Sequence, residues 1–327
     1  MSARVTAVRP AWATEGGRIT IEGTGFGVGQ SRLPDVQIGA ARARVVYASP
    51  TAIGVIVPSG LEGGATPIAV EGASGDRSSI GVCAAFATGL HQVDNPVFDR
   101  DGNLYVTYSG TRGQQVPVSI FKVRPNGTRE TFSSGIVNAT SMAIDEEGRL
   151  YVSSRFEGTV YRVAADGTFE PFANDLGVAC GLAFAADGAL FVGDRSGTLF
   201  RVDRQGKANA FASVPASVAA FHLAIGPDRA VYVTAPTLST YDSVFRVDLD
   251  GTVTTFETRF GRPQGITFEP GGAALVVEAL AGASGLYRLR PDGQPELVVA
   301  GPGLVGVAVD PTGGLVVSSN ETVYRLN

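Results

Sequence analysis

Polar and reactive side chains recur at one position of this 327-residue chain, just ahead of short apolar segments that repeat along it. Six residues hold this position: Asp94, Thr140, Cys180, Phe221, Gln264 and Val305. His222 follows the fourth of them, and a histidine beside a carboxylate can act as a general base. If the repeated segments surround a common axis, Asp94, Asp194 and Glu278 are the carboxylates that could lie around His222. These residues form the catalytic hypothesis.

The same positions could also bind a ligand without catalysis. Amide, hydroxyl, carboxylate and guanidinium groups fix a ligand through hydrogen bonds. The candidate ligand-binding residues are Asp94, Asn95, Thr140, Arg155, Arg195, His222, Gln264 and Asn320. Asp194 with Arg195, and Arg155 with Glu157, could instead form ion pairs within their loops. A lone histidine beside a channel is more often a satisfied polar residue than a base, so binding is the favoured interpretation.

Cys180 is interpreted as a packing residue. A nucleophilic thiol needs a basic neighbour or a helix N-terminus that lowers its pKa, and no histidine or basic residue adjoins Cys180. The only other cysteine is Cys83, so a framework of several disulfides is excluded. We predict two free and largely buried thiols.

An aromatic residue followed by a basic one recurs between aliphatic neighbours, at a spacing of roughly forty residues. The copies are Ile120-Phe121-Lys122-Val123, Val160-Tyr161-Arg162-Val163, Leu199-Phe200-Arg201-Val202, Val244-Phe245-Arg246-Val247, Leu286-Tyr287-Arg288-Leu289 and Val323-Tyr324-Arg325-Leu326. Asp-Gly and related turns between the apolar segments indicate hairpins. This pattern is typical of four-stranded propeller blades. The motif is predicted to be the third strand, with the aromatic ring packed between blades and the basic group bound to nearby carbonyls or carboxylates.

The last repeat stops after its third strand, because the sequence ends at Asn327. The missing strand resembles a segment near residue 84: Ala84-Ala85-Phe86-Ala87-Thr88-Gly89 is similar to Pro171-Phe172-Ala173-Asn174. An open ring would leave unpaired strand edges. We therefore predict six blades over residues 81–327, closed by a strand at about residues 82–89.

Residues 1–80 lack the repeat and have their own turn pattern. A strand ending at Pro10 precedes the Gly16-Gly17 turn, an alternating strand and then Gly23-Thr24-Gly25-Phe26-Gly27. These motifs resemble the IPT/TIG family of immunoglobulin-like domains, which implies a small β-sandwich that serves as a spacer or interaction module. Trp12, the only tryptophan, fits a packed core or a domain interface better than a ligand platform.

The repeats over residues about 84–327 resemble the six-bladed gluconolactonase/regucalcin and NHL-repeat propellers. The likeness is carried by units such as Cys180-Gly181-Leu182-Ala183-Phe184-Ala185-Ala186-Asp187-Gly188-Ala189-Leu190-Phe191-Val192. The resemblance implies a divalent cation held at the channel mouth by Glu, Asn, Asn and Asp, which polarises a lactone carbonyl. Here only Asp94 can stand in for these ligands, and a hard cation needs several oxygen ligands. A Ca²⁺ or Zn²⁺ ion at Asp94 stays an alternative, and no cofactor is predicted.

Composition excludes some partners. The net charge is -5 and no run of Lys or Arg occurs, so nucleic-acid binding is not expected. No apolar run reaches the roughly twenty residues of a membrane helix, and the first residues lack the apolar core of a secretory signal. The expected location is cytoplasmic by default, or secreted or cell-envelope if a leader precedes this sequence.

The sequence therefore predicts an all-β chain with an immunoglobulin-like sandwich over residues 1–80 and a six-bladed propeller over residues 81–327. The favoured function is a non-enzymatic binding or scaffold protein that holds a small molecule, glycan or protein segment at the channel mouth. The alternative is a divergent metal-dependent lactone or ester hydrolase of the gluconolactonase/regucalcin-like family. The scarcity of acid and amide groups at the six repeated positions favours binding.

Overall fold

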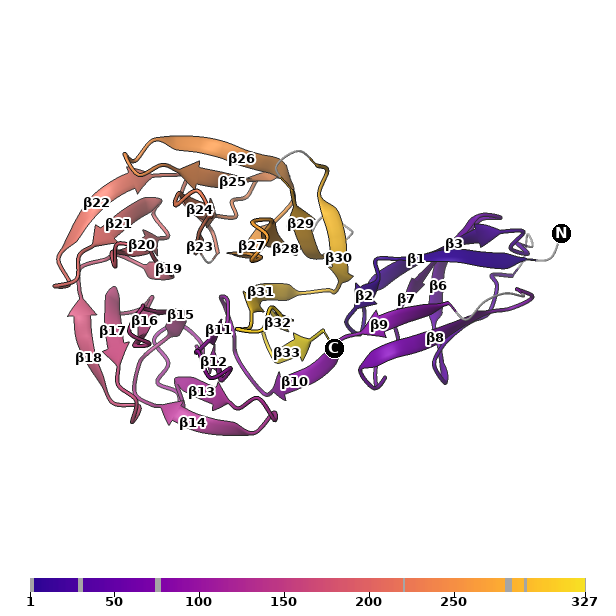
Figure 1. The fold of residues 1–327 in the computed structure, drawn as a ribbon, viewed down its shortest axis with the longest axis horizontal. Helices are drawn as coiled ribbons and strands as arrows, with labels where there is room; N and C mark the ends of the chain where they lie inside the picture. Colours follow the sequence, from indigo (N-terminus) through magenta and orange to yellow (C-terminus); the bar gives the residue numbers. More distant parts are fainter. Residues whose placement is uncertain are drawn as a thin grey trace.

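The computed structural model describes residues 3–28, 32–73, 78–219, 221–279, 284–290 and 293–326. All regular elements in these ranges are β-strands, which confirms the all-β prediction. A ring of sheets surrounds a central channel, and a smaller sandwich stands beside the ring (Figure 1). No helix in the described ranges has the length and apolarity needed to cross a membrane.

The N-terminal sandwich buries alternating aliphatic side chains between two sheets. Its strands are β1 (Arg4–Arg9), β2 (Trp12–Ala13), β3 (Arg18–Thr24), β4 (Val36–Ile38), β5 (Ala41–Arg42), β6 (Arg44–Ala48), β7 (Ala52–Ile56), β8 (Gly64–Val70) and β9 (Ser79–Val82). One sheet has the order β1-β3-β7-β6, and β9, β8, β4 and β5 run side by side in the other. In β3, Ile19 and Ile21 are fully buried while Arg18 is exposed. This alternation is expected of a strand with one solvated face.

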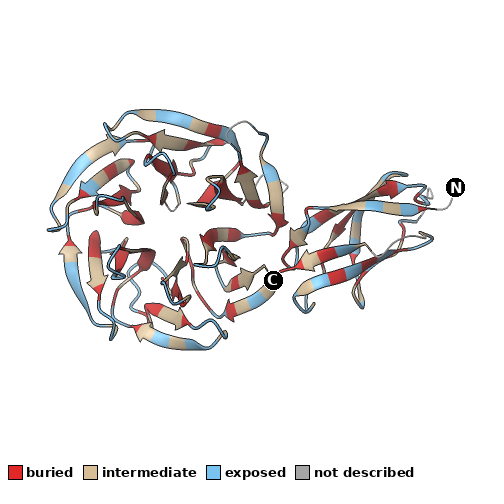
Figure 2. Ribbon diagram, in the orientation of Figure 1, coloured by how far each residue is buried: buried red, intermediate tan, exposed pale blue. Residues whose placement is uncertain are grey.

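Six antiparallel units of four strands form the blades of the ring. Five of them are separate sheets, and the strands of blade 5 belong to a larger sheet. Blade 1 comprises β11 (Val97–Phe98), β12 (Leu104–Thr107), β13 (Ile120–Val123) and β14 (Arg129–Ser133). Blade 2 comprises β15 (Ala139–Ile144), β16 (Leu150–Ser154), β17 (Thr159–Val163) and β18 (Phe169–Ala173). Blade 3 comprises β19 (Ala179–Phe184), β20 (Leu190–Asp194), β21 (Thr198–Val202) and β22 (Ala208–Ser213). Blade 4 comprises β23 (His222–Ile225), β24 (Val231–Thr234), β25 (Asp242–Val247) and β26 (Val253–Phe260). Blade 5 comprises β27 (Pro263–Phe268), β28 (Ala274–Glu278), β29 (Gly285–Leu289) and β30 (Glu296–Ala300). Blade 6 comprises β31 (Leu304–Val309), β32 (Leu315–Ser319), β33 (Thr322–Arg325) and β10 (Ala84–Thr88). Strands β16 and β20 are buried along their whole length, whereas the outer strands reach solvent (Figure 2).

The ring closes with the strand that the sequence predicts. Strand β10 pairs antiparallel with β33, so that Ala85 lies opposite Tyr324 and Thr88 opposite Thr322. The last blade therefore has the order β10-β33-β32-β31. This pairing supplies hydrogen bonds to an edge that would otherwise be open.

The aromatic-basic motif lies on the third strands, as predicted. Its aromatic rings are half-buried and pack against the clusters between neighbouring blades. Five of its basic groups pair with a carboxylate: Lys122–Asp99, Arg162–Glu170, Arg201–Asp187, Arg246–Asp228 and Arg288–Glu269. The sixth, Arg325, lies 4.0 Å from the ring centroid of Phe86. These pairs lie near the surface, so each contributes at most about 1 kcal/mol to stability.

The sandwich and the ring share one sheet. Strand β2 pairs in parallel with β30 of blade 5 on one side and with β9 on the other (Figure 1). The result is a continuous nine-stranded sheet that runs from β27 to β5. Trp12, opposite Val299 and Gly81, packs against the cluster between blades 5 and 6. Of the two roles that the sequence favoured for Trp12, the structure gives it the domain interface.

This junction leads to a testable expectation at Gly81. A methyl group there would lie 2.3 Å from Cε3 of Trp12, so Gly81→Ala is expected to lower the free energy of unfolding by about 1–3 kcal/mol through overpacking. Fluorescence of Trp12, the only tryptophan, reports the transition during urea unfolding. The control is Gly27→Ala, since no atom lies within 4 Å of the added methyl, and we expect a change within about 0.5 kcal/mol. Equal effects of the two substitutions would contradict this account of the junction.

Candidate functional site

One end of the ring collects the six repeated positions. Adjacent strands in a blade are antiparallel, so the segments that lead into the inner strands lie at the same end as the loops between second and third strands. We call this end the mouth face, and the six residues Asp94, Thr140, Cys180, Phe221, Gln264 and Val305 the mouth positions. The opposite end carries the Asp-Gly turns, and we call it the turn face.

A hydrogen-bonded bridge crosses the channel at the mouth positions. Nδ1 of His222 lies 2.5 Å from Oδ1 of Asp94, within hydrogen-bonding distance. Asp94 leads into blade 1 and His222 begins blade 4, and the inner strands follow one another around the ring in chain order. The two residues therefore meet from opposite sides of the ring. Both are buried, with 2% and 0% exposure.

Amide side chains complete this bridge. Nε2 of His222 lies 3.3 Å from Oε1 of Gln264 in blade 5. Nε2 of Gln92 donates to the backbone oxygen of Asp94 at 2.6 Å, and its Oε1 accepts from the backbone of Thr107 at 2.8 Å. The buried cluster thus holds Asp94 from both its backbone and its side chain.

Asn95 ties blade 1 to blades 5 and 6. Its Nδ2 donates to the backbone oxygen of Ile266 at 2.8 Å, and its Oδ1 accepts from the backbone of Val307 at 2.9 Å. Gly265 and Gly306 make room for this side chain, since a methyl group at Gly265 would lie 2.2 Å from Oδ1 of Asn95. Asn95 therefore links blade 1 to blades 5 and 6 through hydrogen bonds at the same level as the bridge.

A cavity of about 420 Å³ occupies the channel on the turn-face side of the bridge. It extends along the inner strands from Asp94 to Phe98, Ile144 and Ile225. Oδ2 of Asp94 is buried and has no hydrogen-bond partner among the described residues. The bridge therefore forms the inner end of this cavity.

The other mouth positions do not supply ligand groups to the channel. The hydroxyl of Thr140 donates to the backbone oxygen of Asn138 at 2.8 Å. Phe221 is fully buried with Phe191 in the cluster between blades 3 and 4, next to Gly193, whose missing side chain makes room for the ring. His222 rather than Phe221 therefore faces the axis in blade 4.

Asp194 and Glu278 hold loops instead of surrounding His222. Oδ1 of Asp194 accepts from the backbone of Val178 at 2.8 Å, and its other oxygen accepts from Ser196. Both oxygens of Glu278 accept from the backbone of Arg262 at 3.1 Å. The structure places each carboxylate against the segment that leads into its own blade, and not in the group predicted from the sequence.

The predicted ion pairs within loops are replaced by other contacts. Arg155 donates to the backbone oxygen of Gly110 at 3.3 Å, while Glu157 accepts from the hydroxyl of Tyr161 at 2.9 Å. Arg195 donates to the backbone oxygen of Val218 at 3.2 Å. The interpretation of Arg155–Glu157 and Asp194–Arg195 as ion pairs is therefore wrong for the described residues.

Asn320 lies at the rim of the mouth face and is exposed. Its Nδ2 donates to the backbone oxygen of Gln92 at 2.7 Å, and the backbone of Gln92 donates in return to Asn320 at 2.8 Å. This exchange fastens the last blade to the segment that leads into blade 1.

Several basic side chains lie near one another at the rim. Burial, followed by the charges of Arg195 and Arg112, holds the pKa of Arg155 below its usual value. Burial and the charge of Arg155 also lower the pKa of His91, whose ring centroid lies 5.9 Å from that of Tyr108. Three guanidinium groups and one imidazole ring thus approach one another above the bridge.

The donors at Asp94 do not fit a divalent cation. No three His, Cys, Asp or Glu side chains come together as a possible metal site in the ranges that the structure describes. The one carboxylate at a mouth position is bound to His222, and Thr140 is committed to Asn138. A Ca²⁺ or Zn²⁺ ion needs more oxygen, nitrogen or thiolate ligands than this arrangement supplies.

Both cysteines are free and buried, as predicted. Burial raises the pKa of Cys83 to about 12, and burial together with the charge of Asp94 raises that of Cys180 to about 12. At pH 8 only about one thiol in 10,000 would be ionised, against roughly a quarter at an ordinary pKa. We expect neither cysteine to react with a maleimide at pH 8 in the folded protein, and both to react in urea, as read by mass spectrometry. Rapid labelling of Cys180 in the folded state would contradict its packing role.

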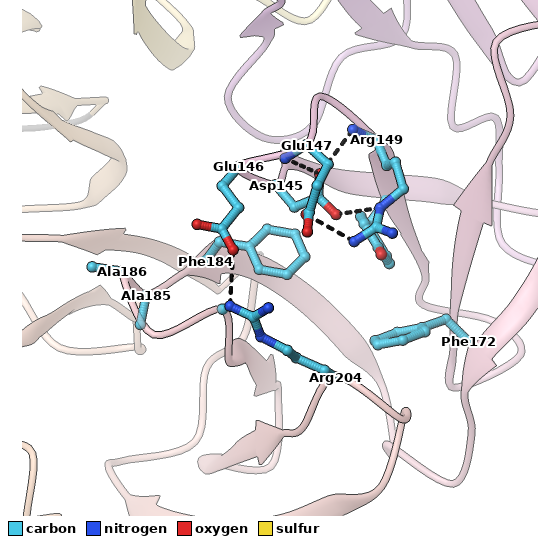
Figure 3. Close-up of a pocket in the computed structure, with 11 residues that line it drawn as sticks. Asp145, Glu146, Glu147, Arg149, Phe172, Phe184, Ala185, Ala186 and Arg204 are labelled. Atoms are coloured by element: carbon cyan, nitrogen blue, oxygen red, sulfur yellow. Dashed lines mark hydrogen bonds and ion pairs between the residues drawn. The ribbon is translucent and has the colours of Figure 1, made fainter.

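A smaller cavity on the turn face holds a different arrangement (Figure 3). It measures about 70 Å³, well below the roughly 300 Å³ of typical ligand pockets. Arg204 reaches across from blade 3 to Glu146 at 2.8 Å, and Arg149 pairs with Asp145 at 2.7 Å and with Glu147 at 2.8 Å (Figure 3). Its charges are therefore paired within the protein, and we interpret it as a contact between blades.

Sequence reasoning missed several residues of the mouth face. Gln92 stands two residues before Asp94, outside the repeated position, and only the fold shows that it holds the bridge. Three exposed apolar residues were also missed: Phe156, Val218 and Leu238. Their positions in the repeat could have identified them, since each lies in a loop that the repeat assigns to the mouth face.

Comparisons with known proteins agree with this architecture. Residues 3–82 match the IPT/TIG domain family, and no curated protein matches the chain. An auxiliary nutrient binding protein from Bacteroides thetaiotaomicron is 13% identical with a TM-score of 0.58, over 99% of this chain and 97% of that one. A gluconolactonase from Xanthomonas campestris is 17% identical with a TM-score of 0.64, over 75% and 89%. A virginiamycin B lyase from Staphylococcus aureus is 14% identical with a TM-score of 0.54, over 74% and 85%. The chain thus joins an IPT/TIG domain to a propeller of the fold seen in gluconolactonases and virginiamycin B lyases.

Proposed function

We propose that this protein is a binding propeller that holds a small molecule, glycan or protein segment on its mouth face. The observation that carries the proposal is the concentration of exposed apolar and unpaired basic side chains there. Phe156 is 53% exposed, Leu238 90% and Tyr241 66%. Aromatic rings that stay exposed beside hydrogen-bonding groups are typical of recognition surfaces.

The buried bridge supports binding over catalysis. A general base must reach the proton that it abstracts, directly or through one water. His222 has no exposed surface, and its two ring nitrogens face Asp94 and Gln264. Asp94 and His222 therefore hold opposite blades together.

Structural likeness over the full length does not separate the two candidates. The auxiliary nutrient binding protein is matched over 97% of its length, and a virginiamycin B lyase from Staphylococcus aureus over 98%. Identities this low establish a shared fold only. The proposed ligand class therefore rests on the residues of the mouth face.

A divergent hydrolase is the second candidate, and one observation favours it. Oδ1 of Asp94 orients His222, as a carboxylate orients a base in many hydrolases, while Oδ2 lies unpartnered at the end of the 420 Å³ cavity. A substrate would have to enter through the channel from the turn face. The two candidates therefore differ in which end of the ring is used.

Metal content and lactone turnover separate these candidates. The full chain would be analysed for bound metal, tested for thermal shifts with Ca²⁺ and Zn²⁺, and screened against sugar lactones. The binding proposal expects neither stoichiometric metal nor turnover. One metal per chain, with turnover that Asp94→Ala abolishes, would overturn it.

Binding itself is tested with a matched pair of phenylalanines in blade 2. Phe156 lies in a mouth-face loop, and Phe169 lies on outer strand β18 with 36% exposure. In a calorimetric screen of sugars, sugar acids and peptides, Phe156→Ala is expected to weaken binding of the best compound about tenfold, because a buried aromatic contact is lost. Phe169→Ala is expected to leave the affinity unchanged. Equal loss in both variants, or loss in Phe169→Ala alone, would place binding elsewhere.

A further inference from the structure

Arg155 and Arg195 occupy equivalent places in neighbouring blades. Arg155 follows the last residue of β16 and Arg195 follows the last residue of β20. Each guanidinium donates one hydrogen bond to a backbone oxygen of an adjoining blade, at Gly110 and at Val218. These contacts hold both groups in place on the mouth face while most of their five N–H donors stay available.

One of those donors is left without a partner inside the protein. Nε of Arg195 is buried and forms no hydrogen bond with any described residue. A buried donor without an acceptor destabilises the protein unless a ligand or water supplies one. Nε of Arg195 is thus a donor that the described residues leave unsatisfied.

Neither arginine has a carboxylate partner, in contrast with arginines elsewhere in the ring. Arg149 and Arg204 pair with acids on the turn face (Figure 3), and Arg201 pairs with Asp187. Among the described ion pairs of the propeller, none involves Arg155 or Arg195. Arg155 and Arg195 therefore lack the direct carboxylate contact that the turn-face arginines have.

The acids near these arginines are already engaged. Asp94 lies beneath them in the bridge to His222. Asp194 accepts from Val178 and Ser196, and Glu157 accepts from Tyr161. These carboxylates form no ion pair with the two guanidinium groups, whose remaining donors are left for a bound molecule.

Like charges gathered in a partly buried place disfavour one another. Burial lowers the pKa of Arg155, and the nearby charges of Arg195 and Arg112 lower it further. An anion between them would reverse both effects, since it supplies acceptors and opposite charge together. Guanidinium groups also match the planar, two-oxygen geometry of carboxylate and phosphate.

We infer that the ligand of the mouth face carries an oxyanion group, a carboxylate, phosphate or sulfate, that Arg155 and Arg195 bind together. This inference rests on the proposed binding function and specifies its ligand. The exposed rings of Phe156 and Tyr241 would contact the less polar part of the same molecule. The expected ligand is therefore an acidic small molecule or sugar with one apolar face.

Titration calorimetry of the full chain in a low-salt buffer without other oxyanions tests this inference. The probes are inorganic phosphate, sulfate, glucuronate and, as the neutral reference, glucose. We expect saturable binding of at least one oxyanion and weaker binding of glucose. Comparison of phosphate, sulfate and glucuronate then identifies the preferred group.

Two variants and a control locate the binding site. Arg155→Gln and Arg195→Gln are each expected to weaken oxyanion binding about tenfold or more, because a charge-assisted contact is lost. Arg201→Gln removes a paired arginine of the turn face and is expected to change affinity by less than about twofold. Oxyanion binding that survives both mouth-face substitutions would overturn the inference. Tight glucose binding that neither substitution changes would overturn the inference and still support the binding function. No binding of any probe would count against the inference and the binding function alike.

Stability without ligand gives a readout that does not depend on ligand choice. Because Arg155 is repelled by its neighbours, Arg155→Gln is expected to leave the melting temperature within about 1 °C of the original or to raise it. The oxyanion that binds most tightly in calorimetry is expected to raise the melting temperature of the original protein more than that of the variant at the same concentration. A fall of several degrees in Arg155→Gln without ligand would show a structural arginine and overturn the inference.

Discussion

Replacing His222 with leucine is expected to lower the free energy of unfolding by about 1–3 kcal/mol, since it leaves a buried oxygen of Asp94 without its hydrogen-bond partner. The two residues meet at 2.5 Å from opposite sides of the ring, and both are essentially without exposed surface. Loss of the bridge therefore affects blades 1 and 4 together. Urea unfolding followed by circular dichroism measures the effect.

The double variant Asp94→Leu/His222→Leu distinguishes a bridge from two independent residues. Replacing both members of a buried pair by apolar residues is often nearly neutral, so the double variant is expected to be more stable than His222→Leu alone. Independent residues would give additive losses instead. A loss below about 1 kcal/mol in His222→Leu would mean that the bridge contributes little to folding.

Ala87→Asp is expected to destabilise the protein by about 3 kcal/mol or more, because it buries a charge at the seam where the ring closes. Ala87 is 6% exposed and packs with Leu104, Val316 and Val323 between the last and first blades. The neighbouring Ala85 lies on the same strand, opposite Tyr324, and is exposed. Ala85→Asp is therefore the matched control, with an expected change within about 0.5 kcal/mol.

Thermal and urea unfolding of the two alanine variants test the closure. Comparable stability of Ala87→Asp and the unsubstituted chain would mean that β10 does not seal the ring. A large loss in Ala85→Asp as well would mean that the strand has a different register. Only a selective loss at Ala87 agrees with the pairing of β10 and β33.

The ring and its closing strand could be predicted from the sequence because they depend on local signals. Tight turns and alternating apolar residues repeat in each blade, and the segment at Phe86 matches the fourth strands. The free cysteines and the packing role of the aromatic-basic motif followed from the same repeat. These features require only that each unit fold like its neighbours.

The contacts across the ring could not be predicted in this way. Whether Phe221 or His222 faces the axis depends on the room that Gly193 leaves for the phenylalanine ring. The repeat places Asp194 and Glu278 on the mouth face, but each carboxylate accepts hydrogen bonds from backbone groups of its own blade instead of pointing to His222. The sheet shared through β2 joins segments almost three hundred residues apart, and no local pattern reports that pairing.

Hydrogen–deuterium exchange of the full chain tests the binding account most directly. The probe is whichever of phosphate, sulfate or glucuronate binds most tightly in calorimetry. Protection is expected in the mouth-face loops at residues 108–119, 154–159, 194–198 and 215–219, with the turn-face segments at residues 145–149 and 203–207 unchanged. Protection confined to the turn-face segments or to the sandwich at residues 3–82 would contradict the mouth face as the binding site.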